Sequence, residues 1–446
     1  MKAKIVLYLA LLPALPICAQ VAPAGIGDNP YVDEAYRMPI PPLVDAKPFP
    51  MLSMSEEREN YLQASLRVEP AYTDNVLSGN SAKPQSDTSY SVLPYLSFDH
   101  TSARLHLNWN YAPDMQAYEK ISARNSLSQY AVMNGEYRLT RHTTFSFSEN
   151  FVKSDNVFGQ PFNLLGQPTT GASTESPTDV VAPFIEHESN SARVEASYQP
   201  TRNALIGVGA ESSLFEYPNL NQAKGLGNSD TISESAFYSR RLRGNQYAGL
   251  TYEHTKVMES SSTGDVTIRI HNLLPFYMLS IGKGVSFTVS SGPQYYQEYY
   301  WPVVMSAAWS PSATVSLSWQ MIRTNIAVTG SRSVTGGGGL LGEYETDAGN
   351  AMLRQRLSRN WFVQTSGGYI DRKNASNSLF MANRELGHTV TSSISIDHTL
   401  SGRITTRLGY EREHLNYSQV SVIAIDPDVN RVSFSISYQL RRSIGR

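Results

Sequence analysis

The stretch Val432-Ser-Phe-Ser-Ile-Ser-Tyr-Gln-Leu440 alternates apolar and polar residues without a break. Successive side chains of a β-strand point to opposite faces, so this stretch presents one face of Val, Phe, Ile, Tyr and Leu and another of Ser and Gln. A helix of the same sequence would mix both kinds of side chain on every face. The stretch therefore predicts a strand that separates an apolar from a polar environment.

The same alternation recurs upstream, and the connections show a second regularity. Alternating segments include 62–69, 104–111, 314–320, 393–397 and 404–411. Short turns lie near His100, Thr140, Pro200, Leu242, Ile281, Ile322, Ser358 and Leu400. Longer polar loops span about 73–87, 113–126, 156–185, 217–231, 258–264, 298–312, 335–345, 372–386 and 416–429. Eight turns and nine loops in strict alternation predict 18 strands, and 16 to 18 fit the pattern.

Short turns, long external loops and an even strand count are typical of bacterial outer-membrane barrels. Besides helices, only closed barrels satisfy every backbone polar group in lipid. We therefore expect an all-β fold, a transmembrane antiparallel up-and-down β-barrel with both chain ends in the periplasm. The expected location is the outer membrane of a Gram-negative-type bacterium, in contact with its lipid and inserted by the barrel assembly machinery.

Composition excludes several other classes of protein. The chain has 446 residues, 10% aromatic and 17% charged, with a net charge of -2. A disordered chain would carry more net charge and fewer aromatics. Nucleic acid is excluded as a partner because no basic excess is present to neutralise phosphates. Beyond the N-terminus no window reaches 18 consecutive apolar residues, which excludes transmembrane helices.

The N-terminus reads as a secretory signal peptide. Lys2 and Lys4 precede an apolar run from Ile5 to Leu12, and we expect cleavage after Ala19. A lipoprotein signal at Cys18 is the alternative, although Ile17 replaces the small residue that such a signal requires. Cleavage removes the only cysteine, so the mature chain is expected to lack disulfides and thiolate metal sites.

Residues 20–58 form a separate region, between the signal peptide (1–19) and the barrel (59–446). Seven of the 24 prolines lie there, without alternation. The region is a Pro-rich periplasmic linker or a partial lumen plug. A stable independent plug would need its own apolar core, for which the region is short.

Eighteen strands enclose a lumen too wide for opposing side chains to fill, which predicts a water-filled conduit. Charged residues on the polar faces are the candidates for lining it: Arg67, Glu69, Arg104, Arg193, Glu195, Arg269, Arg354, Arg356, Arg407 and Glu411. The mixture of signs predicts weak ion selectivity. Alternatively, these groups only solvate the wall and pair across strands.

The loop at 156–185 is the candidate constriction. It spans about thirty residues, and in general porins the third external loop folds inward. Here Phe162, Glu175 and Asp179 would narrow the lumen, with the two acids facing Arg354 or Arg356. The alternative is a mobile surface loop.

Two motifs suggest a family. Tyr72-Thr-Asp-Asn-Val76 follows the first strand, and Leu93-Pro-Tyr-Leu96 leads into a strand that returns from Arg104 to Tyr111. This opening resembles a β-barrel porin family associated with exopolysaccharide loci, over roughly residues 60–440. The resemblance implies an outer-membrane barrel with a link to polysaccharide export and no catalytic residues. The tail from Gln439 to Arg446 departs from the terminal aromatic residue common in outer-membrane barrels.

We expect a channel for passive diffusion of small hydrophilic solutes, or the barrel component of a surface-polysaccharide system. A non-conducting surface-binding barrel or an outer-membrane hydrolase is the alternative. We expect no enzyme, because Asp397 and His398, like Asp99 and His100, point to opposite faces of a strand. No cofactor or metal is expected, and no HExxH spacing occurs. Tyr295, Tyr296 and Tyr299 to Trp301 are either girdle aromatics or a sugar contact, and Thr335 to Gly339 is predicted to be a flexible external loop.

Overall fold

The computed structural model describes residues 38–41, 60–77, 84–155, 185–219, 226–261, 264–281, 284–300, 303–337, 339–375, 385–417 and 428–444. These residues form eighteen β-strands and one short 3-10 helix, η1 (Ser122–Arg124). The strands are β1 (Tyr61–Thr73), β2 (Asp87–Thr101), β3 (Leu105–Tyr118), β4 (Ser126–Arg138), β5 (Thr143–Ser154), β6 (His187–Thr201), β7 (Ala204–Glu216), β8 (Asn228–Arg243), β9 (Gln246–Ser261), β10 (Gly264–Ile281), β11 (Val285–Tyr300), β12 (Val303–Gln320), β13 (Thr324–Gly337), β14 (Leu340–Arg356), β15 (Trp361–Asn374), β16 (Glu385–Thr399), β17 (Ile404–Tyr417) and β18 (Asp428–Ser443).

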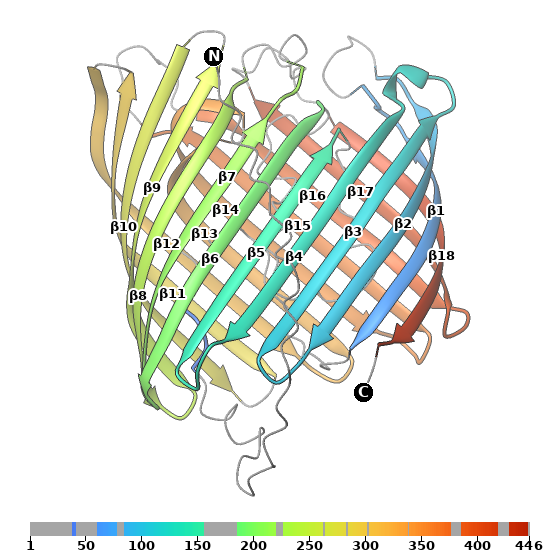
Figure 1. The fold of residues 1–446 in the computed structure, drawn as a ribbon. Coiled ribbons are helices and arrows are strands. Elements are labelled where there is room, and N and C mark those ends of the chain that lie inside the picture. The colour runs from blue at the N-terminus through green and yellow to red at the C-terminus, as the bar shows by residue number, and fades with distance from the viewer. Residues whose placement is uncertain are drawn as a thin grey trace, which may run out of the picture. The chain divides into compact units, whose positions relative to one another are not determined.

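Every strand pairs antiparallel with its sequence neighbours, and β1 also pairs with β18. This last pairing runs from Tyr61 opposite Ser443 to Thr73 opposite Arg431. It closes the sheet into a barrel of tilted strands (Figure 1). The closed up-and-down barrel of eighteen described strands confirms the predicted fold class. In the described residues, no helix is long and apolar enough to cross a membrane.

The two faces of the sheet differ as the alternation predicts. On β1, Leu66 and Val68 are 47% and 45% exposed, whereas Arg67 between them is 3% exposed. On β18, Phe434 and Ile436 are exposed and Ser435 is buried. Exposed apolar side chains form the outer, lipid-facing surface, and the alternate polar side chains form the inner face. Pairing carries this assignment from strand to strand, because directly opposed residues share a face.

The strand boundaries differ from prediction at three loops on the outer rim. Predicted loop 258–264 is strand in its described residues, since β9 extends to Ser261 and β10 begins at Gly264. Predicted loops 298–312 and 335–345 are mostly strand, since β11 extends to Tyr300, β12 begins at Val303, β13 ends at Gly337 and β14 begins at Leu340. Prolines and glycines in these segments suggested loops. In the barrel, Pro293 of β11 and Pro311 of β12 lie opposite each other within paired strands. The glycines near Gly337 lie at the tip of the long hairpin formed by β13 and β14.

Glycines facing aromatic rings fix the register between some strands. On the inner face, Gly249 of β9 lies under Phe276 of β10. A Cβ atom at this position would lie 2.5 Å from Phe276 Cζ and 2.0 Å from the backbone oxygen of Tyr238. Only glycine therefore permits the close approach of these three strands.

Candidate functional site

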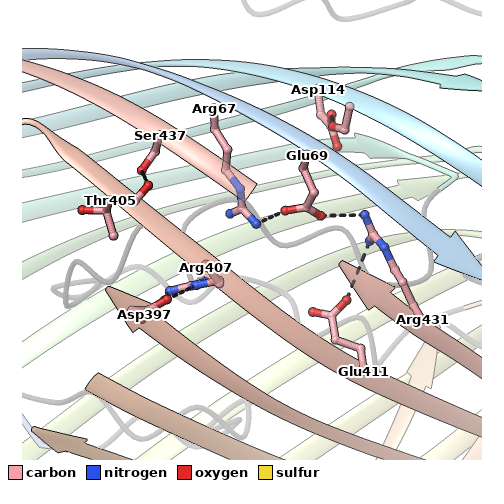
Figure 2. Close-up of polar contacts among 10 residues, drawn as sticks. Arg67, Glu69, Asp114, Asp397, Thr405, Arg407, Glu411, Arg431 and Ser437 are labelled. Atoms are coloured by element: carbon pink, nitrogen blue, oxygen red, sulfur yellow. Dashed lines mark hydrogen bonds and ion pairs between the residues drawn. The ribbon is translucent and has the colours of Figure 1, made fainter. Parts of the chain in front are cut away.

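Charged side chains gather on the inner face where the barrel closes, at β1, β16, β17 and β18 (Figure 2). Six of them define what we call the charged network: Arg67, Glu69, Asp397, Arg407, Glu411 and Arg431. Their strands follow one another in the sheet, so side chains more than 300 positions apart in sequence become neighbours.

Arg431 is the centre of this network. Its Nη2 donates to Glu69 Oε1 at 2.8 Å, and its Nη1 lies 3.7 Å from Glu411 Oε2. Glu69 in turn accepts a hydrogen bond from Arg67 on the same strand. Two guanidinium groups therefore share one carboxylate, and a second carboxylate balances the shared charge.

Arg407 and Asp397 form the adjoining pair. The Arg407 guanidinium donates twice to the carboxylate, through Nε to Oδ1 and through Nη2 to Oδ2, the second at 3.0 Å. Such two-point contacts fix both the distance and the plane of the guanidinium. Nearby, Ser437 donates to the backbone oxygen of Thr405 at 3.2 Å, and Ser91 donates to Asp114.

Four of the six residues of the network are buried, and the side chains of Arg407 and Glu411 are partly buried, at 10% and 21% exposed. The exposed fractions are 3% for Arg67, 6% for Glu69, 5% for Asp397 and 5% for Arg431. Buried charges are stable only when paired and hydrogen-bonded, which explains why each arginine in this group contacts a carboxylate. The network is therefore a run of alternating positive and negative groups on the inner face, each paired with a neighbour of opposite sign.

A second charged group lies on β6 and β7. Arg193 donates to Glu195 Oε2 at 3.1 Å and to Glu211 Oε2 at 3.3 Å. Ser191 also donates to Glu211, at 3.3 Å. The inner wall thus repeats the pairing of one arginine with two carboxylates at a distant position around the sheet.

The candidate lining residues divide into three groups by position. Register places Arg67, Glu69, Arg193, Glu195, Arg354, Arg356, Arg407 and Glu411 on the inner face. Arg354 and Arg356 lie over the ring of Phe362, at 5.2 and 5.7 Å from its centre. Arg104 is exposed in the turn between β2 and β3, outside either strand.

Arg269 lies on the opposite face from the one predicted. On β10 the inner face carries Val266, Ile268 and Ile270, so Arg269 points outward and stacks over the Tyr299 ring at 5.0 Å. The prediction placed polar residues inside throughout. On this part of β10 the apolar residues face inward, because Ile268 and Ile270 pack against Val334 of another strand and not against water, as described below.

Sequence reasoning missed Arg431, although a signal was present. Arg431 continues the polar face of the C-terminal stretch by one step beyond Ser433. Its partners Glu69 and Glu411 come from the two neighbouring strands. The alternation assigns its face, whereas its partners follow only from the register.

Other predicted features have different outcomes. Phe162, Glu175 and Asp179 lie outside the described residues. Tyr295 lies on the outer face, 5.0 Å from Trp309 between ring centres, as interfacial girdle residues do. In the described part of the chain, no group of three or more His, Cys, Asp or Glu is arranged to hold a metal ion.

Four residues of the predicted linker or plug are described, at 38–41. Met38 is 3% exposed and packs with Leu205, Phe237 and Tyr247, whose side chains belong to the inner face of β7, β8 and β9. Its backbone N–H donates to Gln199 Oε1 at 3.4 Å. Met38 therefore lies against the inner wall, near the turns that join β6 to β7 and β8 to β9.

Comparison with known proteins shows only distant similarity. No protein-family model and no curated protein match the chain. Pseudomonas aeruginosa OpdK, solved with vanillate, matches at 10% identity and a TM-score of 0.40 over 85% of this chain and 99% of that one. Pseudomonas aeruginosa OpdO matches at 10% and 0.42 over 86% and 97%. A bacterial polysaccharide outer-membrane secretin matches at 9% and 0.32 over 84% and 98%. At these values the matches carry no argument about function.

Proposed function

We propose that this protein is an outer-membrane channel through which small hydrophilic solutes diffuse. The observation that carries the proposal is the contrast between the two faces of one closed sheet. Apolar side chains such as Leu66 and Phe434 cover the outside, and a charged network covers part of the inside. A polar inner wall of paired charges suits a lumen that holds water and polar solutes.

The same wall sets the expected selectivity. Arginines and carboxylates alternate within contact distance, so neither sign dominates the charged network. Paired charges attract both ends of a dipolar solute and repel neither cations nor anions strongly. We therefore expect permeation by neutral or zwitterionic polar solutes, with weak ion selectivity.

A closed, surface-polysaccharide or surface-binding barrel is the second candidate, and one observation favours it. Inner-face side chains such as Gln63, Arg67 and Arg431 are 2–5% exposed, whereas the side chains that line an open, water-filled lumen would be exposed to solvent. The wall is therefore largely covered in this conformation.

Single-channel recording separates the two candidates. The mature protein is reconstituted in planar bilayers with and without residues 156–185, and folding is checked by heat-modifiable gel migration. Stable conductance steps support the channel, and an increase on deletion identifies the loop as a constriction. Silence from both folded proteins would refute passive diffusion and leave the closed barrel.

A further inference from the structure

The outer end of β13 separates from β12, whereas β14 stays paired with β15 as far as Tyr344 opposite Asn374, so that only the tip of the β13–β14 hairpin extends beyond both neighbours. Pairing between β12 and β13 stops at Ala313 opposite Arg332. Beyond this point β12 continues with β11 as far as Val303, and β13 continues with β14 as far as Gly337 opposite Leu340. The described residues of 333–346 thus form a two-stranded extension without β12 as a neighbour, which we call the lumen hairpin.

Apolar packing places the lumen hairpin inside the barrel. Val334 is 2% exposed and belongs to one cluster with Val257, Ile268, Ile270 and Tyr296. These four side chains lie on the inner face of β9, β10 and β11, in register with Glu259 and Gln294. The hairpin therefore covers the inside of three strands and explains the inverted polarity of β10.

Two polar side chains of the wall hold the hairpin backbone. Glu259 accepts hydrogen bonds from Gly337 N at Oε1 and from Gly342 N at Oε2, both at 2.6 Å. Gln294 accepts from Val334 N at 2.7 Å and donates to Val334 O at 2.8 Å. One carboxylate thus joins both strands of the hairpin across its tip, and one amide fixes its base.

The glycine-rich tip makes this contact possible. A Cβ atom at Gly336 would lie 2.6 Å from Ile268 Cδ1 and 3.0 Å from Glu259 Oε1. Gly337 and Gly342 have φ angles of 90° and 88°, which side-chain-bearing residues rarely adopt. The glycines therefore bring the backbone amides within reach of the Glu259 carboxylate.

The other face of the hairpin carries hydroxyl groups. Ser333 opposes Thr346 and Thr335 opposes Tyr344, and these pairs alternate with Val334. Thr335 Oγ1 lies 3.1 Å from Thr346 Oγ1. The wall-facing side is apolar and acidic, whereas the side turned away from the wall carries the hydroxyl groups of Ser333, Thr335 and Thr346 beside the buried Arg372 of β15, which lies opposite Thr346.

We propose that the lumen hairpin is the constriction at the outer end of the channel, that its hydroxyl-bearing face contacts polar solutes such as sugars, and that Glu259 is the positioning residue that holds the hairpin there. The proposal rests on the channel function proposed above. Loss of the Glu259 carboxylate frees two backbone amides of the tip, and the hairpin then leaves the wall for part of the time.

The test uses the full chain with Cys18→Ser, so that Val334→Cys supplies the only thiol. Glu259→Ala is combined with Val334→Cys, and labelling by a thiol reagent is followed in outer membranes. The matched control is Glu253→Ala, since Glu253 lies on the same inner face of β9 and accepts from Thr255 at 3.2 Å. It lies six residues, or about 20 Å, nearer the other rim.

We expect Glu259→Ala to raise the labelling rate by about tenfold or more, because it removes the two hydrogen bonds that hold the hairpin tip and leaves their backbone donors without this partner. It should also raise single-channel conductance and admit larger sugars in liposome swelling, and Glu253→Ala should change none of these. Unchanged labelling would refute the role of Glu259. Faster labelling with unchanged conductance and sugar limit would refute the constriction. If folded wild type and all variants are silent, the channel function and the constriction both fail, while labelling still decides whether Glu259 holds the hairpin.

Discussion

Replacing Arg431 with glutamine tests whether the charged network is a desolvated structural unit. The variant keeps a hydrogen-bonding side chain but removes the positive charge between Glu69 and Glu411. With an effective dielectric constant of about 20, the contacts at 2.8 and 3.7 Å correspond to gross attractions of about 6 and about 4 kcal/mol. Most of this offsets desolvation, so leaving buried charge uncompensated should lower the free energy of unfolding by about 3–5 kcal/mol.

The measurement is urea unfolding in lipid vesicles, followed by the fluorescence of the five tryptophans. Arg412→Gln is the matched control. Arg412 also makes a two-point contact with a carboxylate, donating to Asp428 at 2.9 and 2.8 Å, but on the exposed outer face. This pair lies at the rim of the barrel, where β18 begins at Asp428, and exposed pairs outside the lipid contribute little because water screens them. Equal losses from the two variants would refute the reasoning, since they would mean that water screens the inner network as well.

Three further outcomes are expected. Arg407→Gln should shift the permeability ratio towards cations, whereas Arg269→Gln, on the outer face, should leave it unchanged; equal shifts in planar-bilayer reversal potentials would contradict the face assignment. Gly249→Val should abolish the folded, heat-modifiable band because of the Tyr238 oxygen and the Phe276 ring, whereas Gly402→Val, with open space around it, should fold. Met38→Asp should speed proteolytic cleavage near residues 38–41, because it places a carboxylate among Leu205, Phe237 and Tyr247. Ile40→Asp, at a position that is 37% exposed, should not change the cleavage rate. Equal cleavage of the two variants would show that Met38 does not hold this segment against the wall.

The fold could be predicted because lipid imposes one simple rule on each strand. An apolar outside and a polar inside produce the period-two pattern of Val432 to Leu440, and the chain repeats it often enough to count strands. The rule fails where another part of the protein replaces water. On β10, Ile268 and Ile270 face the lumen hairpin and not water. The alternation of polar and apolar residues therefore predicts the inner face for Arg269, which lies on the outer face.

The candidate site could be predicted only as a set of separate charges. Alternation assigns faces to Arg67, Glu69 and Arg407, whereas Arg104 lies beyond the end of its strand in a turn. The contact between Arg431 and Glu69 joins residues 362 positions apart and depends on the register of the closing strands. The glycine run at 336–339 suggested a flexible loop, because nothing local shows that Glu259 binds its backbone.

The pairing of β1 with β18 also determines the order of events during assembly. One edge of β1 has no partner until β18 is in place, so a chain that lacks β18 would leave two unpaired strand edges facing lipid. Such an intermediate has no stable place in a bilayer, and seventeen correctly formed strands gain little until the eighteenth arrives. Insertion should therefore be close to all-or-none, and the whole chain should be exported before any part of it is stably inserted. Truncated chains should be degraded by periplasmic proteases and not inserted into the membrane.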